Sequence, residues 1–405
     1  MATVDGKRHI IVFALVTALC LIGDSMLYIA LPVHFEEAGL SSLWEVGVIL
    51  AVNRIVRLPL NPCAGWFYSH VSEKAGILIA VCLAFAATLS YGYLDSFALW
   101  IVARCVWGVA WTLLRLGSLF CILKLATPAT RGYYTGLYNG LYRLGSLVGM
   151  LVGGVLADTV GFKATALIFA VATGCALLPA IVFFPGGNGA EKECDAGASI
   201  LEGLKRIARS RDMVRIIITG ALVALVIQGV IASTLSRLIA VHTGGTVTLA
   251  GLVVGAASLA GVFQALRWGW EPWLAPMVGR LGDTRYGWPG ILAGTFLAAG
   301  ALYGLLALRL PLTLWLACLL GVQLAATALT TAADAAASEC AASGEGRLLL
   351  MQYALFTDVG AALGPLTAYA MDGIWGIDVV YASCAVLFLC LAMVWRRAAS
   401  EHFHL

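Results

Sequence analysis

Long stretches of apolar residues, separated by short polar connections, run along most of the chain. Each stretch is close to the roughly 20 residues that a helix needs to cross a hydrocarbon layer about 30 Å thick. The 405 residues therefore accommodate about twelve membrane-spanning helices. The first stretch is too long for the core of a signal peptide, so we expect it to be the first helix. The pattern predicts spans over residues 9–35, 43–69, 75–94, 97–124, 133–158, 162–184, 214–241, 247–273 continuing to 281, 288–308, 311–336, 347–371 and 376–395.

One long polar segment, residues 187–213, separates the apolar stretches into two groups of six. Within it, Leu204 and Ile207 lie opposite Lys205 and Arg209 at helical spacing, which predicts a short basic amphipathic helix on the membrane surface. A tether between two halves is the simpler interpretation, and a regulatory or partner-binding role is the alternative. The expected organisation is an N-terminal six-helix bundle over 1–186, a cytoplasmic linker over 187–213 and a C-terminal six-helix bundle over 214–405.

The two groups resemble each other in their glycines and prolines, at a distance of about 215 residues. Two like halves within one apolar chain are typical of secondary transporters. The corresponding positions are Gly145, Gly149, Gly153 and Gly154 with Gly360, Gly364 and Pro365, and Pro62, Gly65 and Ser69 with Pro276, Gly279 and Asp283.

Composition and charge place the chain in a bilayer. Hydrophobic residues make up 61% and charged residues 12%, which is too little polar material to cover a soluble protein. The loops on one side of the predicted helices are rich in Lys and Arg, and the opposite loops contain only Lys163 and Arg309 beside several acids, including Asp158 and Asp372. The positive-inside rule then predicts a multi-pass protein of the cytoplasmic (inner) membrane with both termini in the cytoplasm.

The sequence contains little that indicates a metal site, a cofactor or an enzyme active site. The eleven cysteines are scattered without a CxxC or Cys-His cluster, so we expect no metal and no cofactor. No nucleotide-binding or hydrolase motif occurs, and no nucleophile-base constellation emerges. We therefore expect neither an enzyme nor a nucleic-acid-binding protein, and any uphill transport must use an ion gradient.

Two loop segments carry the first resemblance to a known family. Residues 65–74 are similar to the GxLaDrxGrk motif of the major facilitator superfamily, with Ser69 in place of the acid. Residues 279–285 form a second copy that keeps Asp283, which we expect to be the working copy.

Two helix motifs extend the resemblance over nearly the whole chain. Residues 104–111 resemble the RxxqGxgaa pattern, and residues 145–156 resemble the GxxxGPxxGGxL pattern of drug or metabolite:proton antiporters, with Met150 where proline is usual. The resemblance implies an all-α membrane protein of twelve transmembrane helices in two pseudo-symmetric six-helix bundles. Glycines every fourth residue clear a helix face for a neighbour, either for packing or for movement. The candidate gating positions are Gly65, Ser69, Gly145, Gly149, Gly153, Gly154, Gly279, Asp283, Gly360, Gly364 and Pro365.

Ionisable residues within apolar spans are costly in hydrocarbon and are expected to face a polar cavity or one another. The candidates for substrate binding or proton coupling are Asp24, Arg54, Arg57, Arg104, Arg115, Arg143, Glu271 and Asp358. The resemblance implies that Arg57 faces Asp358 and that Arg143 faces Glu271 across the interface between the halves. Protonation of either acid would loosen its pair. The alternative is a permanent ion pair that only fixes helix packing.

Asp24 and Arg104 have their own alternatives. Asp24 is either a cavity-facing proton or cation site, or the structural partner of an arginine such as Arg115. By resemblance Arg104 is a coupling residue, and hydrogen bonding to nearby helix ends is the alternative.

Aromatic residues gather near these charges. They could stack on a planar substrate or shield a charge pair, although tryptophans in membrane helices are usually interfacial anchors. The candidates are Trp107, Trp111, Tyr138, Tyr142, Trp268 and Trp270.

The excess of arginine over acid within the spans favours an anionic or zwitterionic substrate. The sequence thus predicts a secondary active transporter that moves a small organic molecule by alternating access, with proton-coupled efflux as the first hypothesis. The family resemblance implies a monomer. Proton-coupled import of a metabolite is the alternative within the same class. A non-transporting membrane sensor or receptor on the same fold is the alternative from another class.

Overall fold

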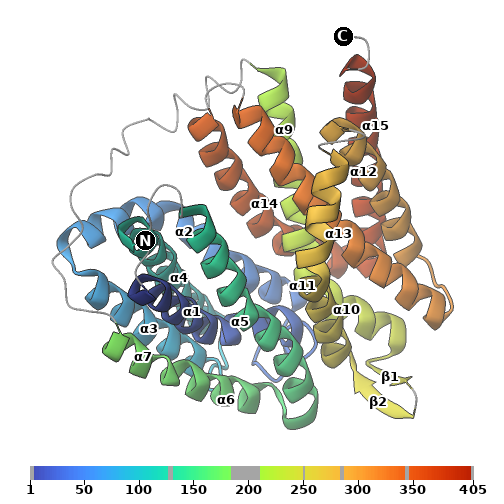
Figure 1. Cartoon of the computed structure of the whole chain (residues 1–405). Coiled ribbons are helices and arrows are strands. Elements are labelled where there is room, and N and C mark those ends of the chain that lie inside the picture. Colours follow the sequence, from blue (N-terminus) through green and yellow to red (C-terminus); the bar gives the residue numbers. More distant parts are fainter. Residues whose placement is uncertain are drawn as a thin grey trace. The chain divides into compact units, whose positions relative to one another are not determined.

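The computed structural model describes residues 4–125, 131–183, 210–249, 251–282, 287–342 and 346–402, which form helices and one short hairpin (Figure 1). These segments group into two compact bodies. The first comprises Met1–Cys194 with Thr248–Val262, and the second comprises Asp195–Val247 with Phe263–Leu405. The elements are α1 (Val4–Ala30), α2 (Leu43–His70), α3 (Glu73–Ser90), α4 (Phe97–Leu125), α5 (Arg131–Val160), α6 (Phe162–Cys175), α7 (Leu177–Phe183), α9 (Arg211–Ala224), η1 (Leu225–Ile231), α10 (Ala232–Thr243), β1 (Thr246–Leu249), β2 (Leu252–Gly255), α11 (Ala256–Leu281), α12 (Gly287–Leu306), α13 (Leu312–Ala342), α14 (Gly346–Trp375) and α15 (Ile377–His402).

Nine helical segments of the described chain are long and apolar enough to cross a membrane. Three further long helices, α2, α11 and α14, carry many of the ionisable residues that the sequence places within spans, which makes them less apolar. Together these segments correspond one for one to the twelve predicted spans. The predicted all-α multi-pass membrane fold is confirmed.

In the first body, α1 packs lengthwise against α5, and α4 packs against α2 and α3. The glycines of α5 allow this close approach. A Cβ atom at Gly145 would lie 2.1 Å from the carbonyl oxygen of Ala18, and one at Gly149 would lie 2.4 Å from that of Ile22. This glycine face therefore packs within the first body, on α1.

The second body repeats this arrangement with different residues. Helix α14 packs against α9 and η1, and α12 packs against α13 and α15. A Cβ atom at Gly360 would lie 2.1 Å from the carbonyl oxygen of Ala221, and one at Gly364 would lie 2.4 Å from the Cα of Gly229. The glycine repeat in the sequence thus corresponds to a repeated mode of helix packing.

The predicted start of the eighth span, at residue 247, is wrong. Residues Thr246–Leu249 and Leu252–Gly255 form a two-stranded hairpin, and α11 begins only at Ala256. The strands contain Val and Thr, which fit an extended backbone well. Gly244, with a positive φ of 74°, ends α10 and turns the chain towards the hairpin.

Other helices are shorter or more broken than the sequence predicts. Helix α1 ends at Ala30, five residues early, and is followed by turns. The sixth span is divided into α6 and α7, and the seventh contains the π-helical segment η1. The basic amphipathic helix predicted in the linker falls outside the described residues, as does Asp283.

Candidate functional site

Asp24 on α1 and Arg104 on α4 form a buried ion pair in the first body. Arg104 Nη1 donates a hydrogen bond to Asp24 Oδ1, and the arginine side chain is fully buried. The Asp24 side chain is 10% exposed. The guanidinium of Arg104 stays charged at physiological pH.

Further contacts fix the guanidinium between several helices. Arg104 Nε donates to the carbonyl oxygen of Ile49 on α2 at 3.0 Å, and Nη1 donates to the Tyr91 hydroxyl at 3.2 Å. Tyr91 follows α3 and stacks on Trp100, with 5.1 Å between the ring centroids. Burial raises the pKa of the Tyr91 hydroxyl to about 12, so this group stays neutral and only accepts from Arg104. One arginine therefore connects α1, α2, α4 and the end of α3.

Helices α4 and α2 contain one buried donor and one buried acceptor without a hydrogen-bond partner among the described residues. They are Arg104 Nη2 and Asn53 Oδ1. Asn53 lies one turn beyond Ile49 on α2, and Gly108 lies one turn beyond Arg104 on α4. A Cβ atom at Gly108 would lie 3.1 Å from the carbonyl oxygen of Asn53, so these two turns face each other. Buried polar groups are normally paired, so these two atoms are exceptions within the first body.

Four of the six aromatic candidates form a row along α4 and α5. The ring centroids are 6.3 Å apart for Trp107 and Trp111, 5.7 Å for Trp111 and Tyr142, and 5.2 Å for Tyr142 and Tyr138. Trp107, Tyr138 and Tyr142 are buried, and the Tyr138 hydroxyl donates to Thr17 Oγ1 on α1 at 3.2 Å. The row therefore lies in the same body as the ion pair.

The remaining cationic candidates of the first body are not partners in the Asp24–Arg104 ion pair. Arg115, the expected alternative partner of Asp24, is exposed and lies three turns beyond Arg104 on α4, so the specific pairing with Arg115 is wrong. Arg143 on α5 is also exposed. Arg54 and Arg57 on α2 are half-buried, and Arg54 Nε reaches the Tyr28 hydroxyl at 3.5 Å.

In the second body the aromatic candidates lie on α11. The guanidinium carbon of the buried Arg267 lies 5.5 Å from the Trp268 ring centroid, and Trp270 Nε1 donates to Thr327 Oγ1 on α13 at 3.3 Å. Glu271 on α11 and Asp358 on α14 are half-buried. The pairs implied by resemblance, Arg57 with Asp358 and Arg143 with Glu271, would join the two bodies and stay predictions.

Two acids counted among the charges of the outer side lie in helices. Asp372 lies in α14 and accepts a hydrogen bond from Arg237, and Asp158 lies in the last turn of α5. An acid at the end of an apolar stretch can lie within the helix when a residue of opposite charge neutralises it. Such a residue is distant in the sequence, so the local pattern does not reveal it. Helix α14 therefore continues past the predicted end at residue 371, whereas Asp158 lies within the predicted span 133–158.

The gating candidates divide by their surroundings. Gly153 faces Met26 on α1, whereas a Cβ atom at Gly154 would lie 2.4 Å from the carbonyl oxygen of Ala257, at the start of α11. A Cβ atom at Gly279 on α11 would have no neighbour within 4 Å among the residues that the structure describes, and Pro365 lies inside α14. Gly65 and Ser69 belong to α2.

Sequence reasoning missed Asn53 and Tyr91 at the ion pair, and His34 and Ser258 at a second polar network near the end of α5. Asn53 carries a signal, because it is a polar residue beside Arg54 within an apolar span. Tyr91 carries none, because aromatic residues are common at helix ends in membranes.

Comparisons with known proteins agree with the fold. Over 192 residues the chain is 25% identical to a probable vesicular acetylcholine transporter-B of Danio rerio, covering 44% of this chain and 38% of that protein. It is also 25% identical over 127 residues to the vesicular acetylcholine transporter of Mus musculus, covering 31% and 24%. The chain thus matches well under half the length of these curated relatives.

Solved structures match over almost the whole chain. A bacterial homologue of the human lysosomal transporter Spinster, inward-facing and unoccupied, has a TM-score of 0.72 at 15% identity and covers 99% of this chain and 98% of its own. The nucleoside transporter NupG has a TM-score of 0.75 at 13% identity, with coverages of 97% and 98%. A profile of the family described as Major Facilitator Superfamily matches residues 13–346, and because this is most of its length, the chain belongs to that superfamily.

Proposed function

We propose that this protein is a secondary active transporter that exchanges a small zwitterionic molecule for protons by alternating access, with Asp24 and Arg104 as the coupling pair. Family membership indicates a transporter rather than an enzyme. Efflux is the direction we propose, with both termini in the cytoplasm and a single chain as the working unit.

The buried Asp24–Arg104 pair is the observation that carries this proposal. Two charges buried together are stable only while each neutralises the other, and removal of one partner typically costs about 3–5 kcal/mol. A proton on Asp24 removes the negative charge and leaves the guanidinium without a counter-ion. A substrate group that interacts with either residue therefore has to exchange with the proton or bind together with it.

The charge of the substrate decides whether it exchanges with the proton or binds together with it. The ammonium group of a zwitterion competes with the proton for Asp24, while its carboxylate accepts from Arg104. Arg104 Nη2 and Asn53 Oδ1, which have no hydrogen-bond partner in the described part of the chain, would supply a donor and an acceptor. Competition for one carboxylate is the physical basis of antiport. The curated relatives are named as transporters of acetylcholine, itself an ammonium compound.

A purely anionic substrate leads to the opposite coupling and is the second candidate. A proton on Asp24 frees Arg104 to bind the anion, so proton and substrate enter the site together. This predicts symport and hence uptake driven by the proton gradient. The observation that favours it is the number of arginines on the spans of the first body, Arg54, Arg57, Arg115 and Arg143 in addition to the paired Arg104.

The sign of proton movement tests the proposal. The protein is reconstituted in vesicles that contain a pH-sensitive dye, and amino acids, betaines or dicarboxylates are added outside. Antiport makes the interior more alkaline when a zwitterion enters, whereas symport of an anion makes it more acidic. Because this sign depends on coupling alone, mixed insertion of the protein does not obscure it.

Substitutions then assign the coupling to the pair. Asp24→Asn is expected to abolish substrate-dependent proton movement, and Asp24→Glu should keep part of it. Asp95→Asn is the matched control, because Asp95 also forms an ion pair, with Lys163, but its side chain is 68% exposed. Proton movement that persists in a folded Asp24→Asn variant would contradict the role of this pair. Absence of flux with every compound would favour a sensor or receptor.

A further inference from the structure

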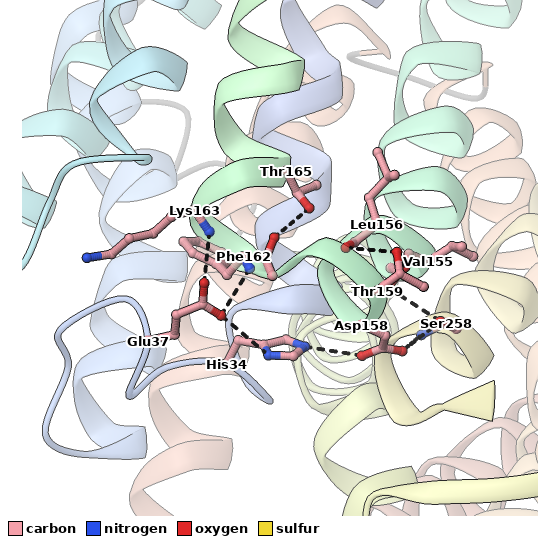
Figure 2. A network of polar contacts seen from close by, with 12 residues as sticks. His34, Glu37, Val155, Leu156, Asp158, Thr159, Phe162, Lys163, Thr165 and Ser258 are labelled. Atoms are coloured by element: carbon pink, nitrogen blue, oxygen red, sulfur yellow. Dashed lines mark hydrogen bonds and ion pairs between the residues drawn. The ribbon is translucent and has the colours of Figure 1, made fainter. Parts of the chain in front are cut away.

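A second polar network connects three segments of the first body, and Figure 2 shows His34 between two carboxylates. His34 lies in the turns that follow α1. Its Nε2 atom is 3.1 Å from Asp158 Oδ1 in the last turn of α5, and its Nδ1 atom is 3.8 Å from Glu37 Oε2. The imidazole therefore lies within hydrogen-bond distance of Asp158 and within ion-pair distance of Glu37.

Each of these acids accepts hydrogen bonds at the start of a helix. Asp158 Oδ2 accepts from the backbone N–H of Ser258 at 2.7 Å and from its hydroxyl at 2.6 Å, in the first turn of α11. Glu37 accepts from the backbone N–H groups of Phe162 at 3.0 Å and Lys163 at 3.2 Å, where α6 begins. Helix N-termini have unsatisfied N–H groups and favour negative charge, so both contacts stabilise the helix starts.

The start of α11 also packs tightly on α5. A Cβ atom at Gly261 would lie 2.4 Å from the carbonyl oxygen of Met150, and one at Gly255 would lie 2.1 Å from Asp158 Oδ2. Residues Thr248–Val262 group with the first body, whereas α11 from Phe263 onwards groups with the second. The Asp158 carboxylate thus holds the part of α11 that belongs with α5.

The charges around His34 are not balanced when the imidazole is neutral. Asp158 and Glu37 are both negative, and the nearby cation, Lys163, is engaged by Asp95, with 2.5 Å between its Nζ and Asp95 Oδ1. A neutral imidazole has one N–H donor and can donate a hydrogen bond to only one of the two acids. An imidazolium has two N–H donors and a positive charge, so it can interact favourably with both acids.

We propose that His34 is a proton-binding site that controls how firmly Asp158 holds the N-terminus of α11. With a proton on His34, the two acids are bridged and Asp158 keeps its orientation towards Ser258. Without it, the two carboxylates repel each other and the hold on Ser258 weakens. If the protein is the transporter proposed above, this site provides a second entry for protons into its conformational cycle through α11.

Hydrogen exchange measures this hold directly. The purified full chain in lipid nanodiscs is exchanged between pH 5 and 8, the range in which histidine changes charge, and rates are corrected for intrinsic pH dependence. Protection of the first amides of α11 is expected to fall on the order of tenfold as the pH rises, which corresponds to loss of about one charge-assisted hydrogen bond.

Variants separate proton binding from simple structure. His34→Gln keeps a side-chain donor without titrating, and should give low protection that does not change with pH. Asp158→Asn should lower protection at every pH. The matched control is His242→Gln, because His242 stacks on Trp315 with 4.2 Å between ring centroids, and it should keep the pH step.

The proposal is overturned if the wild-type protein shows no pH step, if His34→Gln keeps the step, or if Asp158→Asn leaves protection unchanged. The measurement of amide hydrogen exchange requires no transported substrate. A protein without any flux in vesicles would therefore refute the transport function while leaving this test intact.

Discussion

Arg237 on α10 donates a hydrogen bond from Nε to Asp372 Oδ2 on α14 across 3.2 Å, within the second body. The Asp372 side chain is 2% exposed, and that of Arg237 is 33% exposed. One turn before Asp372, the Tyr369 hydroxyl donates to the carbonyl oxygen of Ser233, so two side chains of α14 hold α10. A buried carboxylate that depends on one partly exposed arginine makes a sharp test of helix docking.

Removal of this pair should destabilise the second body. Asp372→Ala leaves Arg237 without its acceptor and is expected to cost about 1–3 kcal/mol, less than a fully buried pair because a third of the arginine is in contact with solvent or lipid. Thermal unfolding in detergent, followed by tryptophan fluorescence, measures the change. Asp212→Ala is the control, because Asp212 forms an ion pair with Arg215 but is 74% exposed. Equal melting temperatures for the two variants would contradict a stabilising role for Asp372.

Tyr91 should position Arg104 without taking part in proton exchange itself. Tyr91→Phe removes one acceptor from the guanidinium and is expected to cost about 0.5–1.5 kcal/mol. Since burial raises the pKa of Tyr91 to about 12, the hydroxyl is neutral below that pH in both activity and stability measurements. Flux in vesicles should therefore fall in amplitude while its pH midpoint stays where it is. Tyr93→Phe, at a side chain 68% exposed, is the matched control. A shifted midpoint in Tyr91→Phe alone would argue that Tyr91 itself titrates.

The helices could be predicted from the sequence because length and hydrophobicity together specify a membrane span. The hairpin at residues 246–255 could not be predicted, because its Val- and Thr-containing sequence suits a strand as well as an apolar helix. Gly244, Gly245 and Gly251, all with positive φ, are the signal that separates the two possibilities. Breaks such as η1 follow from tertiary packing, since Gly229 contacts Gly364 there, and no local pattern reveals that contact.

The site could be predicted residue by residue but not as an arrangement. Asp24 and Arg104 are conspicuous because a charge in an apolar span is costly. Their pairing depends on the depth at which α1 meets α4, and Arg115, three turns along the same helix, fits the sequence pattern equally well. His34 and Ser258 are ordinary polar residues near helix ends, and only the fold brings them to Asp158.

Glu37 should hold the start of α6. Glu37→Ala removes the acceptor for the N–H groups of Phe162 and Lys163 and is expected to cost about 0.5–2 kcal/mol, as for other helix caps. Hydrogen exchange of residues 162–165 should become faster, since these amides lose their cap. The neighbouring exposed Glu36 offers the control variant Glu36→Ala. Unchanged exchange at Phe162 in the Glu37 variant would show that the cap is dispensable.

The glycines of the repeated packing should tolerate no side chain. A methyl group at Gly145 would lie 2.1 Å from the carbonyl oxygen of Ala18, and one at Gly360 would lie 2.1 Å from that of Ala221. Both distances are far below van der Waals contact with a backbone atom, so α1 or α9 has to move away. Gly145→Ala and Gly360→Ala are each expected to destabilise their body by about 1–3 kcal/mol.

Each of these helices contains its own control. A methyl group at Gly136 on α5 or at Gly373 on α14 would have no atom of another described element within 4 Å, so alanine there adds helix propensity without a clash. Gly136→Ala and Gly373→Ala should leave thermal stability unchanged or raise it by up to about 1 kcal/mol. The same substitution in the same helix thus has opposite expected signs, which separates close packing from helix propensity. If Gly145→Ala melts at the same temperature as Gly136→Ala, the close approach of α5 to α1 is not required for stability.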